Sequence, residues 1–167
     1  MRLLLHACCG PCAVGCVDSL RGEGVEPTLY WYNPNIRPEG EHGARLGSLS
    51  VYAGIARAEV IVVGGYDPDA YAAAALSGAA DRCAACYYLR MEAAARAASE
   101  GGFDAFSTTL LISPYQDAQK IIEAGERSAE AHGVAFLARD FRPLYREGRR
   151  RAREMGLYMQ KYCGCGL

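Results

Sequence analysis

The sequence predicts an α/β fold, a single Rossmann-like domain in which a parallel sheet of about five strands is flanked by helices. Two observations support this prediction. Short apolar runs alternate with longer helical stretches along the chain, and such alternation is typical of a parallel sheet covered by helices on both faces. The 167 residues, 51% of them hydrophobic, are enough to bury one core without covalent support. We therefore expect one domain, residues 1–167.

The first half of the chain carries three of the predicted strands. In chain order, the elements are strand 3–6, helix 11–21, strand 27–32, helix 41–58 and strand 59–63. Pro11 at the first position of its helix and Gly22 just beyond the end are the usual start and stop signals. Pro34 and Pro38 exclude regular pairing after the second strand, so an irregular loop is expected there.

The second half carries the remaining strands. In chain order, the elements are a short helix from Asp67-Pro68 to Gly78, helix 83–99, strand 103–108, helix 113–132 and strand 134–137. The last of these helices is expected to begin at Ser113, because Ser113-Pro114-Tyr115-Gln116 has the pattern of a capping box with proline at the first helical position. A basic segment and a Cys-x-Cys tail, residues 139–167, end the chain.

The charges are unevenly spread. The whole chain has a net charge of −1, but residues 139–161 carry +5 and the remainder −6. A basic strip on an acidic body suits a phosphate-bearing partner such as RNA, which is held through counterion release. The alternative is a solvated, arginine-rich helix face, and charge alone does not choose between the two.

The eight cysteines lie in clusters. They are Cys8, Cys9, Cys12 and Cys16, then Cys83 and Cys86, and finally Cys163 and Cys165. The apolar stretch at the N-terminus is too short for a signal peptide or a membrane span. We therefore expect a cytoplasmic protein with no membrane partner, in which clustered thiols bind metal or carry out redox chemistry.

The clusters are placed where chemistry usually occurs. Cys8 and Cys9 follow the first strand, and ligand sites in parallel sheets lie beyond the carboxyl ends of the strands. Cys83 and Cys86 begin a helix, where the dipole and free N–H groups lower thiol pKa values and favour ligation. Seven clustered thiols exceed one tetrahedral site, which favours an iron–sulfur cluster with a second metal or a redox pair over zinc alone.

Other candidate ligands have simpler interpretations. Cys16, one helical turn beyond Cys12, is expected in the core. His6 lies on an apolar strand and is expected to be a hydrogen-bonded core histidine. His42 and His132 are expected at the surface. Neither a GxGxxG dinucleotide motif nor a GxxxxGK[ST] phosphate loop is present in the sequence.

Several motifs, taken together and in order, resemble a known family. They are Leu5-His6-Ala7-Cys8-Cys9-Gly10-Pro11-Cys12, Tyr32-Asn33-Pro34-Asn35-Ile36-Arg37-Pro38, Arg82-Cys83-Ala84-Ala85-Cys86-Tyr87, Phe106-Ser107-Thr108-Thr109-Leu110-Leu111 and Tyr158-Met159-Gln160-Lys161-Tyr162-Cys163-Gly164-Cys165. The chain resembles the QueH-type, cobalamin-independent epoxyqueuosine reductases essentially from end to end. This resemblance implies a HUP-type α/β fold and the two-electron removal of the epoxide oxygen of epoxyqueuosine at the tRNA wobble position, which gives queuosine.

The resemblance also implies cofactors and partners. A 4Fe–4S cluster would be held by Cys8, Cys9, Cys83 and Cys86. Cys12, Cys163 and Cys165 would hold a second, mononuclear iron or act as a redox pair. The partners implied are tRNA carrying epoxyqueuosine and an external electron donor of the ferredoxin or flavodoxin type.

Roles in catalysis and tRNA binding follow from the same resemblance. The candidates for catalysis are Cys12, Asp67, Cys163 and Cys165, with Asp67 as a proton donor or metal ligand or, alternatively, only an N-cap. The candidates for binding the substrate and tRNA are Asn33, Asn35, Arg37, Arg82, Ser107, Thr108, Thr109, Arg149, Arg150 and Arg151. Tyr71 stands where a tryptophan is expected, and we expect this departure to affect peripheral contacts only.

Two other functions remain open at this point. An iron–sulfur tRNA thiolase would carry an SGGxDS-type ATP loop after the first strand, where this chain has Cys8-Cys9-Gly10-Pro11-Cys12. A non-catalytic, zinc-binding RNA module would be colourless and bind one zinc per chain.

Overall fold

The computed structural model describes residues 1–77 and 80–166 and contains one parallel sheet. Its strands are β1 (Leu3–His6), β2 (Pro27–Trp31), β3 (Val60–Val62), β4 (Ala105–Thr108) and β5 (Ala135–Phe136). They lie in the order β3-β2-β1-β4-β5, and every neighbouring pair is parallel. This is the strand order of a Rossmann-like sheet, so the predicted five-stranded α/β fold is confirmed.

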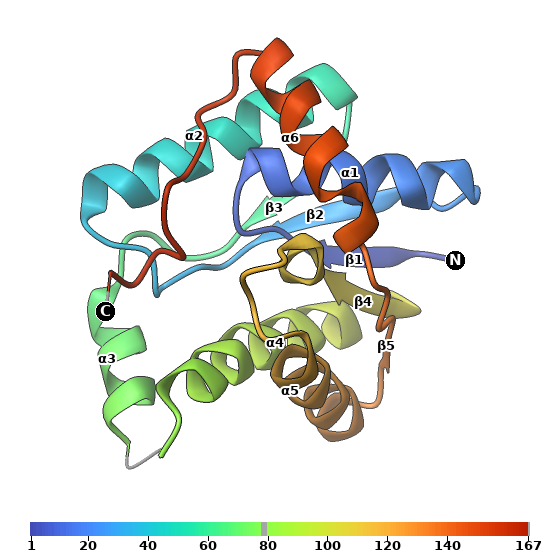
Figure 1. Cartoon of the computed structure of the whole chain (residues 1–167). Coiled ribbons are helices and arrows are strands. Elements are labelled where there is room, and N and C mark those ends of the chain that lie inside the picture. Colours follow the sequence, from blue (N-terminus) through green and yellow to red (C-terminus); the bar gives the residue numbers. More distant parts are fainter. Residues whose placement is uncertain (78–79, 167) are drawn as a thin grey trace.

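Helices cover both faces of the sheet (Figure 1). They are α1 (Gly10–Gly22), α2 (Glu39–Ala56), α3 (Pro68–Leu76), α4 (Arg82–Glu100), α5 (Ala118–His132) and α6 (Tyr145–Glu154). Helices α1, α2 and α6 lie on one face, α4 and α5 on the other, and α3 beside the carboxyl edge. Gly78, the expected end of α3, lies outside the described residues. None of the described helices has both the length and the apolar content needed to span a bilayer.

The core is built around β1, whose four residues are all fully buried. A central strand of a parallel sheet is covered on both faces, which is why Leu3 to Leu5 form a continuous apolar run. Helix α1 approaches α2 closely at Gly10, where an added Cβ would lie 2.6 Å from the Ser48 carbonyl oxygen. Cys16 is fully buried in this core, as predicted.

The predicted start of α5 is wrong. The helix begins at Ala118 and is capped by Asp117, whose carboxylate accepts the Lys120 N–H at 3.2 Å. The Ser113 hydroxyl instead accepts the N–H of Tyr115 at 3.2 Å, which closes a local turn. In a capping box Gln116 would bind back to the Ser113 N–H, but its side chain accepts the Tyr87 hydroxyl. The tertiary contact with Tyr87 therefore replaces the hydrogen bond that Gln116 would form in a capping box.

The surface position predicted for His42 is also wrong. His42 is only 5% exposed, because it lies on the inner side of α2. Its ring packs edge-to-face against Trp31, with the ring centroids 5.3 Å apart. His132, by contrast, is partly exposed and pairs with Glu92 at 2.9 Å.

Candidate metal site at the carboxyl edge of the sheet

A cleft of about 670 Å³ lies at the carboxyl edge of the sheet, and the three cysteine clusters meet in it. The cysteines that line it are Cys8, Cys12, Cys83, Cys86, Cys163 and Cys165. They come from the start of α1, the start of α4 and the end of the chain. The expected convergence of distant thiols at one edge of the sheet is therefore found in the structure.

The cleft lies where the strand order reverses. Strands β1 and β4 are neighbours, with His6 opposite Thr108, and the chain leaves them toward opposite faces of the sheet. Ligands of open α/β sheets usually bind at such a switch point. Thr109, just after β4, holds the start of the thiol loop: its hydroxyl oxygen accepts the Cys8 N–H at 3.2 Å and lies 3.5 Å from the Cys8 Sγ.

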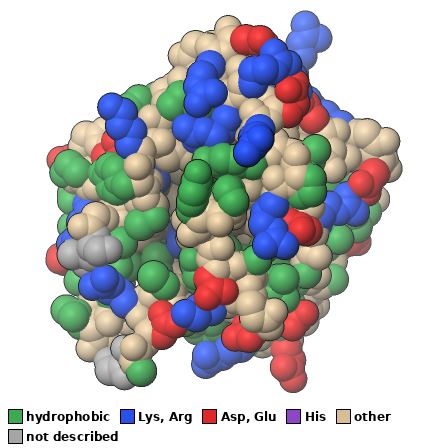
Figure 2. Space-filling view, in the orientation of Figure 1, with side chains coloured by type: hydrophobic (Ala, Val, Ile, Leu, Met, Phe, Trp, Pro, Cys, Tyr) green, Lys and Arg blue, Asp and Glu red, His purple; other side chains and the backbone are tan. Residues whose placement is uncertain are grey.

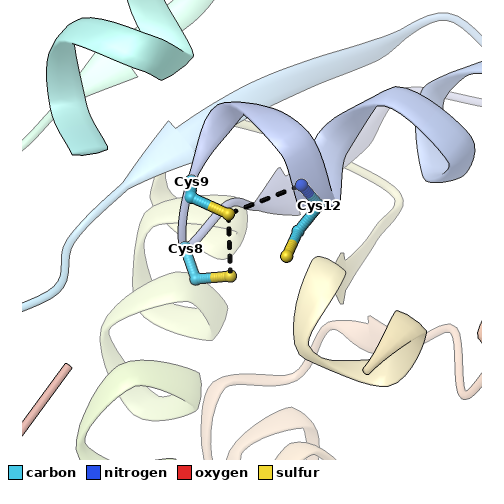
Figure 3. Close-up of side chains that lie close together, drawn as sticks. All are labelled: Cys8, Cys9 and Cys12. Carbon is cyan, nitrogen blue, oxygen red and sulfur yellow. Dashed lines mark hydrogen bonds between the residues drawn. The ribbon is translucent and has the colours of Figure 1, made fainter. Parts of the chain in front are cut away.

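One group of thiols surrounds the N-terminus of α1 (Figure 3). The Sγ atoms of Cys8, Cys9 and Cys12 all lie within 4.8 Å of one another. Cys9 is the N-cap of the helix, and its sulfur accepts the Cys12 N–H at 3.4 Å. The spacing of Cys9 and Cys12 thus comes from a helix start, and Pro11 at the first turn fits that backbone.

The three thiols share negative charge unequally. Hydrogen bonds from the Cys12 and Cys9 thiols lower the pKa of Cys8 well below its usual value. Burial raises the pKa of Cys9, and the hydrogen bond with Cys8 raises the pKa of Cys12. Like charges this close oppose one another, so a bound cation is what would let all three ionise. The donor set therefore fits a thiophilic metal such as iron or zinc.

A second group of thiols is formed by residues of α4 and of the last part of the chain. The Cys163 and Cys165 Sγ atoms lie 3.6 Å apart, and Cys165 packs with Cys86 and Tyr71 in a small buried cluster. Arg90, one turn beyond Cys86, donates from Nη2 to its Sγ at 3.2 Å. Cys83 is exposed on the rim of the cleft.

Tyr71 corrects one expectation. We expected this departure from tryptophan to concern peripheral contacts only, yet Tyr71 lines the cleft and packs against Cys86 and Cys165. Burial, together with a hydrogen bond to Cys165, raises the pKa of the Tyr71 hydroxyl. The substitution is next to candidate ligands because α3, a helix that looks peripheral in sequence, lies at the carboxyl edge of the sheet (Figure 1).

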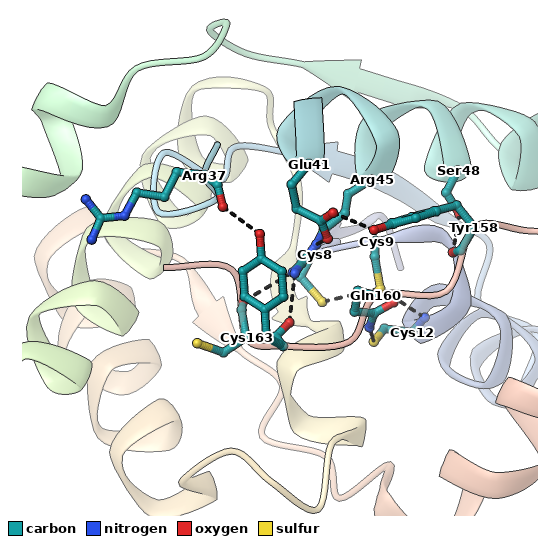
Figure 4. A network of polar contacts seen from close by, with 11 residues as sticks. Cys8, Cys9, Cys12, Arg37, Glu41, Arg45, Ser48, Tyr158, Gln160 and Cys163 are labelled. Atoms are coloured by element: carbon teal, nitrogen blue, oxygen red, sulfur yellow. Dashed lines mark hydrogen bonds and ion pairs between the residues drawn. The ribbon is translucent and has the colours of Figure 1, made fainter. Parts of the chain in front are cut away.

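The last thiols reach the cleft because residues 157–166, here called the C-terminal segment, are bound along α2 (Figure 4). Arg45 donates to the carbonyl oxygens of Tyr162 at 2.7 Å and Cys163 at 3.2 Å, and it pairs with Glu41 at 2.8 Å. The Arg37 Nε donates to the Cys165 carbonyl oxygen at 2.7 Å. Backbone carbonyls are thus held by arginines, and the thiols of the segment are left facing the cleft.

Gly164 lets the C-terminal segment pack closely against the loop that contains Asn35 and Ile36. Its φ of +124° is strained for a residue with a side chain, and an added Cβ would lie 3.0 Å from the Ile36 side chain and 3.1 Å from that of Asn35. Earlier along the segment, Gln160 donates from Nε2 to the Cys12 Sγ at 3.2 Å. The segment therefore contacts both groups of thiols.

The cleft is basic. Arg45, Arg90, Arg149 and Lys161 line it, and no Asp or Glu is found among its described lining residues. Of the predicted basic strip, only Arg149 and Lys161 reach the lining. Arg150 pairs with Glu147 and Glu154 on the outer face of α6, and Arg151 pairs with Asp18.

The other predicted substrate residues are placed unevenly. Asn35 and Thr109 line the cleft, and Arg82 is exposed beside Cys83. Asn33, just after β2, and Ser107 and Thr108, in β4, are buried and hydrogen-bonded. Thr108 and Asn33 bind the two nitrogens of His6, at 2.9 and 3.1 Å. His6 is therefore the core histidine that was predicted, and burial lowers its pKa to about 4.

Asp67 is the N-cap of α3, and its carboxylate accepts the Ala70 N–H at 3.1 Å. It is not among the described residues that line the cleft. The N-cap interpretation is thus confirmed, and the role of proton donor stays a prediction.

Sequence reasoning missed Arg45, Arg90 and Gln160. Arg90 had a local signal, because it lies one helical turn beyond Cys86 on the same helix. The contacts of Arg45 and Gln160 with the cleft had none, since Arg45 meets Cys163, and Gln160 meets Cys12, more than 100 residues away along the chain.

A Rossmann-like sheet with a basic, cysteine-lined cleft at its switch point defines a class of α/β protein whose thiols can hold a metal ion. Within that class, the chain belongs to the epoxyqueuosine reductase QueH family, whose family model matches residues 3–167. A relative named epoxyqueuosine reductase QueH from Dehalococcoides mccartyi is 34% identical, over 98% of this chain and 90% of the relative. Relatives of the same name from Thermotoga maritima and Histophilus somni are 32% and 33% identical, over 98% of this chain and 88% and 70% of their own lengths.

Proposed function

We propose that this chain is an epoxyqueuosine reductase that acts on tRNA in the cytoplasm. The observation that carries the proposal is the family match along the whole chain, joined to a cleft in which six thiols meet under a basic rim. Removing the epoxide oxygen consumes two electrons and two protons, releases one water and leaves a carbon–carbon double bond. A thiol-rich site next to cations suits a reaction that needs both a redox centre and a bound polyanion.

We propose further that the reaction depends on iron and sulfide and needs no cobalamin. When bound, a 4Fe–4S cluster supplies single electrons, and a neighbouring iron supplies a Lewis acid for the epoxide oxygen. The candidate ligands are Cys8, Cys9, Cys83 and Cys86 for the cluster, with Cys12, Cys163 and Cys165 for the second iron or a redox pair. The geometry favours a different division. Short sulfur distances join Cys12 to Cys8 and Cys9 and Cys163 to Cys165, and Cys86 packs with Cys165.

The chain's own residues prepare the site. Burial raises the pKa of the Cys86 thiol, and the Arg90 guanidinium, which donates a hydrogen bond to the Cys86 sulfur, opposes that shift. Arg45 holds the C-terminal segment through its backbone, and Gln160 of that segment donates a hydrogen bond to the Cys12 sulfur. Asp67 remains the proposed proton donor. Electrons are proposed to come from a ferredoxin- or flavodoxin-type protein, since neither of the common nucleotide-binding motifs is present in the sequence.

The test is anaerobic reconstitution with iron and sulfide, followed by turnover of epoxyqueuosine-containing tRNA with a chemical reductant. We expect a brown protein with several irons per chain and formation of queuosine without cobalamin. Cys12→Ala should lower iron content and activity, whereas Cys16→Ala, a matched removal of a buried thiol outside the cleft, should retain both. One zinc per chain with no turnover would favour the RNA module, and a requirement for ATP would favour the thiolase.

A further inference from the structure

The side chains of two tyrosines stand on the rim of the cleft and have no role in the site described above. Tyr115 lies in the loop before α5 and Tyr145 at the start of α6, and both line the cleft. Their ring centroids are 6.0 Å apart at 80°, an edge-to-face pair. Tyr115 is 84% exposed, so most of its ring surface faces solvent at the entrance of the site.

The backbone that carries Tyr115 is held in place. The Ser113 hydroxyl accepts the Tyr115 N–H, and Gln116 is bound to the Tyr87 hydroxyl. A core aromatic side chain buries its apolar surface. The Tyr115 ring does not, although the loop that carries it is anchored. Such a ring on a cleft rim is suited to stacking against a planar partner.

A cation, Arg149, adjoins this pair. The Arg149 guanidinium lies 5.6 Å from the centre of the Tyr145 ring and lines the cleft. It forms no ion pair with the described residues, although Arg150 and Arg151, next to it on α6, are both paired. Figure 2 shows Lys and Arg side chains gathered over α6, with side chains of the hydrophobic class, which includes tyrosine, beside them. An exposed aromatic ring beside an arginine that forms no ion pair with the described residues has the elements of a single-stranded nucleic-acid site.

We propose that Tyr115, Tyr145 and Arg149 form a stacking platform for an unpaired base of the RNA loop, next to the nucleoside that enters the cleft. The base stacks on Tyr115, Tyr145 supports that ring, and Arg149 binds the phosphate between the two nucleotides. A cleft of about 670 Å³ holds a single nucleoside comfortably but not a base-paired stem. The platform thus fixes which nucleotide is presented. This inference rests on the proposed function, because it takes an RNA loop as the substrate.

The test measures binding of an anticodon stem–loop RNA at several salt concentrations. Tyr115→Ala should weaken binding about tenfold, with the slope of log K against log salt unchanged, because a stacked base carries no charge to the protein. Tyr115→Phe should bind like the wild type, because the ring and not the hydroxyl is used. Arg149→Gln should weaken binding and reduce the magnitude of the slope by about 0.7, the value for one phosphate contact with a single strand.

A matched control lies elsewhere on the surface. Arg127 stands over the ring of Tyr88 at 4.2 Å, and neither residue is among those lining the cleft. Arg127→Gln should leave the affinity unchanged. A direct readout of stacking is 2-aminopurine placed on either side of the wobble nucleotide, whose fluorescence should be quenched on binding by wild type and Tyr115→Phe but not by Tyr115→Ala.

The outcomes separate this inference from the function it rests on. Wild-type turnover with RNA binding that does not depend on Tyr115 overturns the platform and keeps the reductase. RNA binding that depends on Tyr115, without turnover of epoxyqueuosine, keeps the platform and removes the reductase. If Tyr115→Ala lowers only turnover driven by a protein electron donor, the rim binds that donor and the platform is wrong.

Discussion

Replacing Arg45 with methionine should release the C-terminal segment from the cleft and leave the rest of the fold in place. Methionine keeps much of the length and apolar volume of the aliphatic part of the Arg45 side chain, so the buried space beside α2 stays filled. The change removes the pair with Glu41 and the two hydrogen bonds to the carbonyl oxygens of Tyr162 and Cys163.

The structure sets the size of the effect. The Arg45 side chain is 2% exposed and that of Glu41 is 11% exposed, so this is a buried pair whose loss costs about 3–5 kcal/mol. Undocking of the segment reduces this free-energy cost, because the Tyr162 and Cys163 carbonyl oxygens and the Glu41 carboxylate then become hydrated. The equilibrium for undocking should therefore shift by about a hundredfold or more, since 1.4 kcal/mol is a factor of ten.

Thiol labelling of the metal-free protein measures this shift. Cys165 is 9% exposed and Cys16 fully buried in the core, so Cys165 reports undocking of the segment and Cys16 reports global unfolding. Arg45→Met should raise the labelling rate of Cys165 about a hundredfold, read by peptide mass spectrometry, and change that of Cys16 far less. Arg96→Met, a change at an exposed position of α4, should alter neither. Equal acceleration of both cysteines would mean that Arg45 stabilises the whole domain, and no acceleration would mean that it does not hold the segment; either result refutes the reasoning.

Three further predictions follow from single contacts. Gly164→Ala should accelerate Cys165 labelling in the same assay, because a residue held at φ +124° costs about 1–3 kcal/mol; an unchanged rate would contradict the close fit. Gly10→Ala should lower the free energy of unfolding by about 1–3 kcal/mol in urea, because its Cβ would meet a carbonyl oxygen of α2 at 2.6 Å, whereas Gly43→Ala, with open space around it, should be neutral or stabilising. Burial lowers the pKa of His6 to about 4, below its unfolded value of about 6.5. The metal-free protein should therefore lose about 3 kcal/mol as pH falls from 6.5 to 4, and a His6→Gln variant should show a shallower loss in urea titrations at each pH.

The fold could be predicted from the sequence because its signals are local. Alternating apolar runs and helix signals place each strand, and a parallel sheet follows from the alternation. The errors arose where a distant side chain overrode a local signal. Gln116 would complete a capping box if Tyr87 did not bind it, and His42 would lie at the surface if Trp31 did not pack against it.

The site could be predicted only to the level of which segments meet. Cys8 and Cys9 follow β1, and that position alone places them at the carboxyl edge. The pairing of Cys165 with Cys86 depends on the path of the C-terminal segment, which is set by arginines more than 100 residues away along the chain. Sequence spacing does not predict contacts between residues this far apart along the chain. The sequence therefore identifies the candidate thiols but not which thiols lie next to one another in the fold.

The position of the cations, rather than their number, makes the cleft suitable for an anionic substrate. A chain with net charge −1 has no overall attraction for RNA, and thiolates inside the cleft would add negative charge. Arg45 and Arg90 are engaged inside, by Glu41 and by the Cys86 sulfur. Arg149 and Lys161 line the cleft and form no ion pair with the described residues. Because Arg45 and Arg90 already have partners inside the cleft, Arg149 and Lys161 are the lining cations that remain available to the phosphate backbone. Removing Arg149 should therefore weaken RNA binding without lowering the iron content, and removing Arg90 should affect the metal site first.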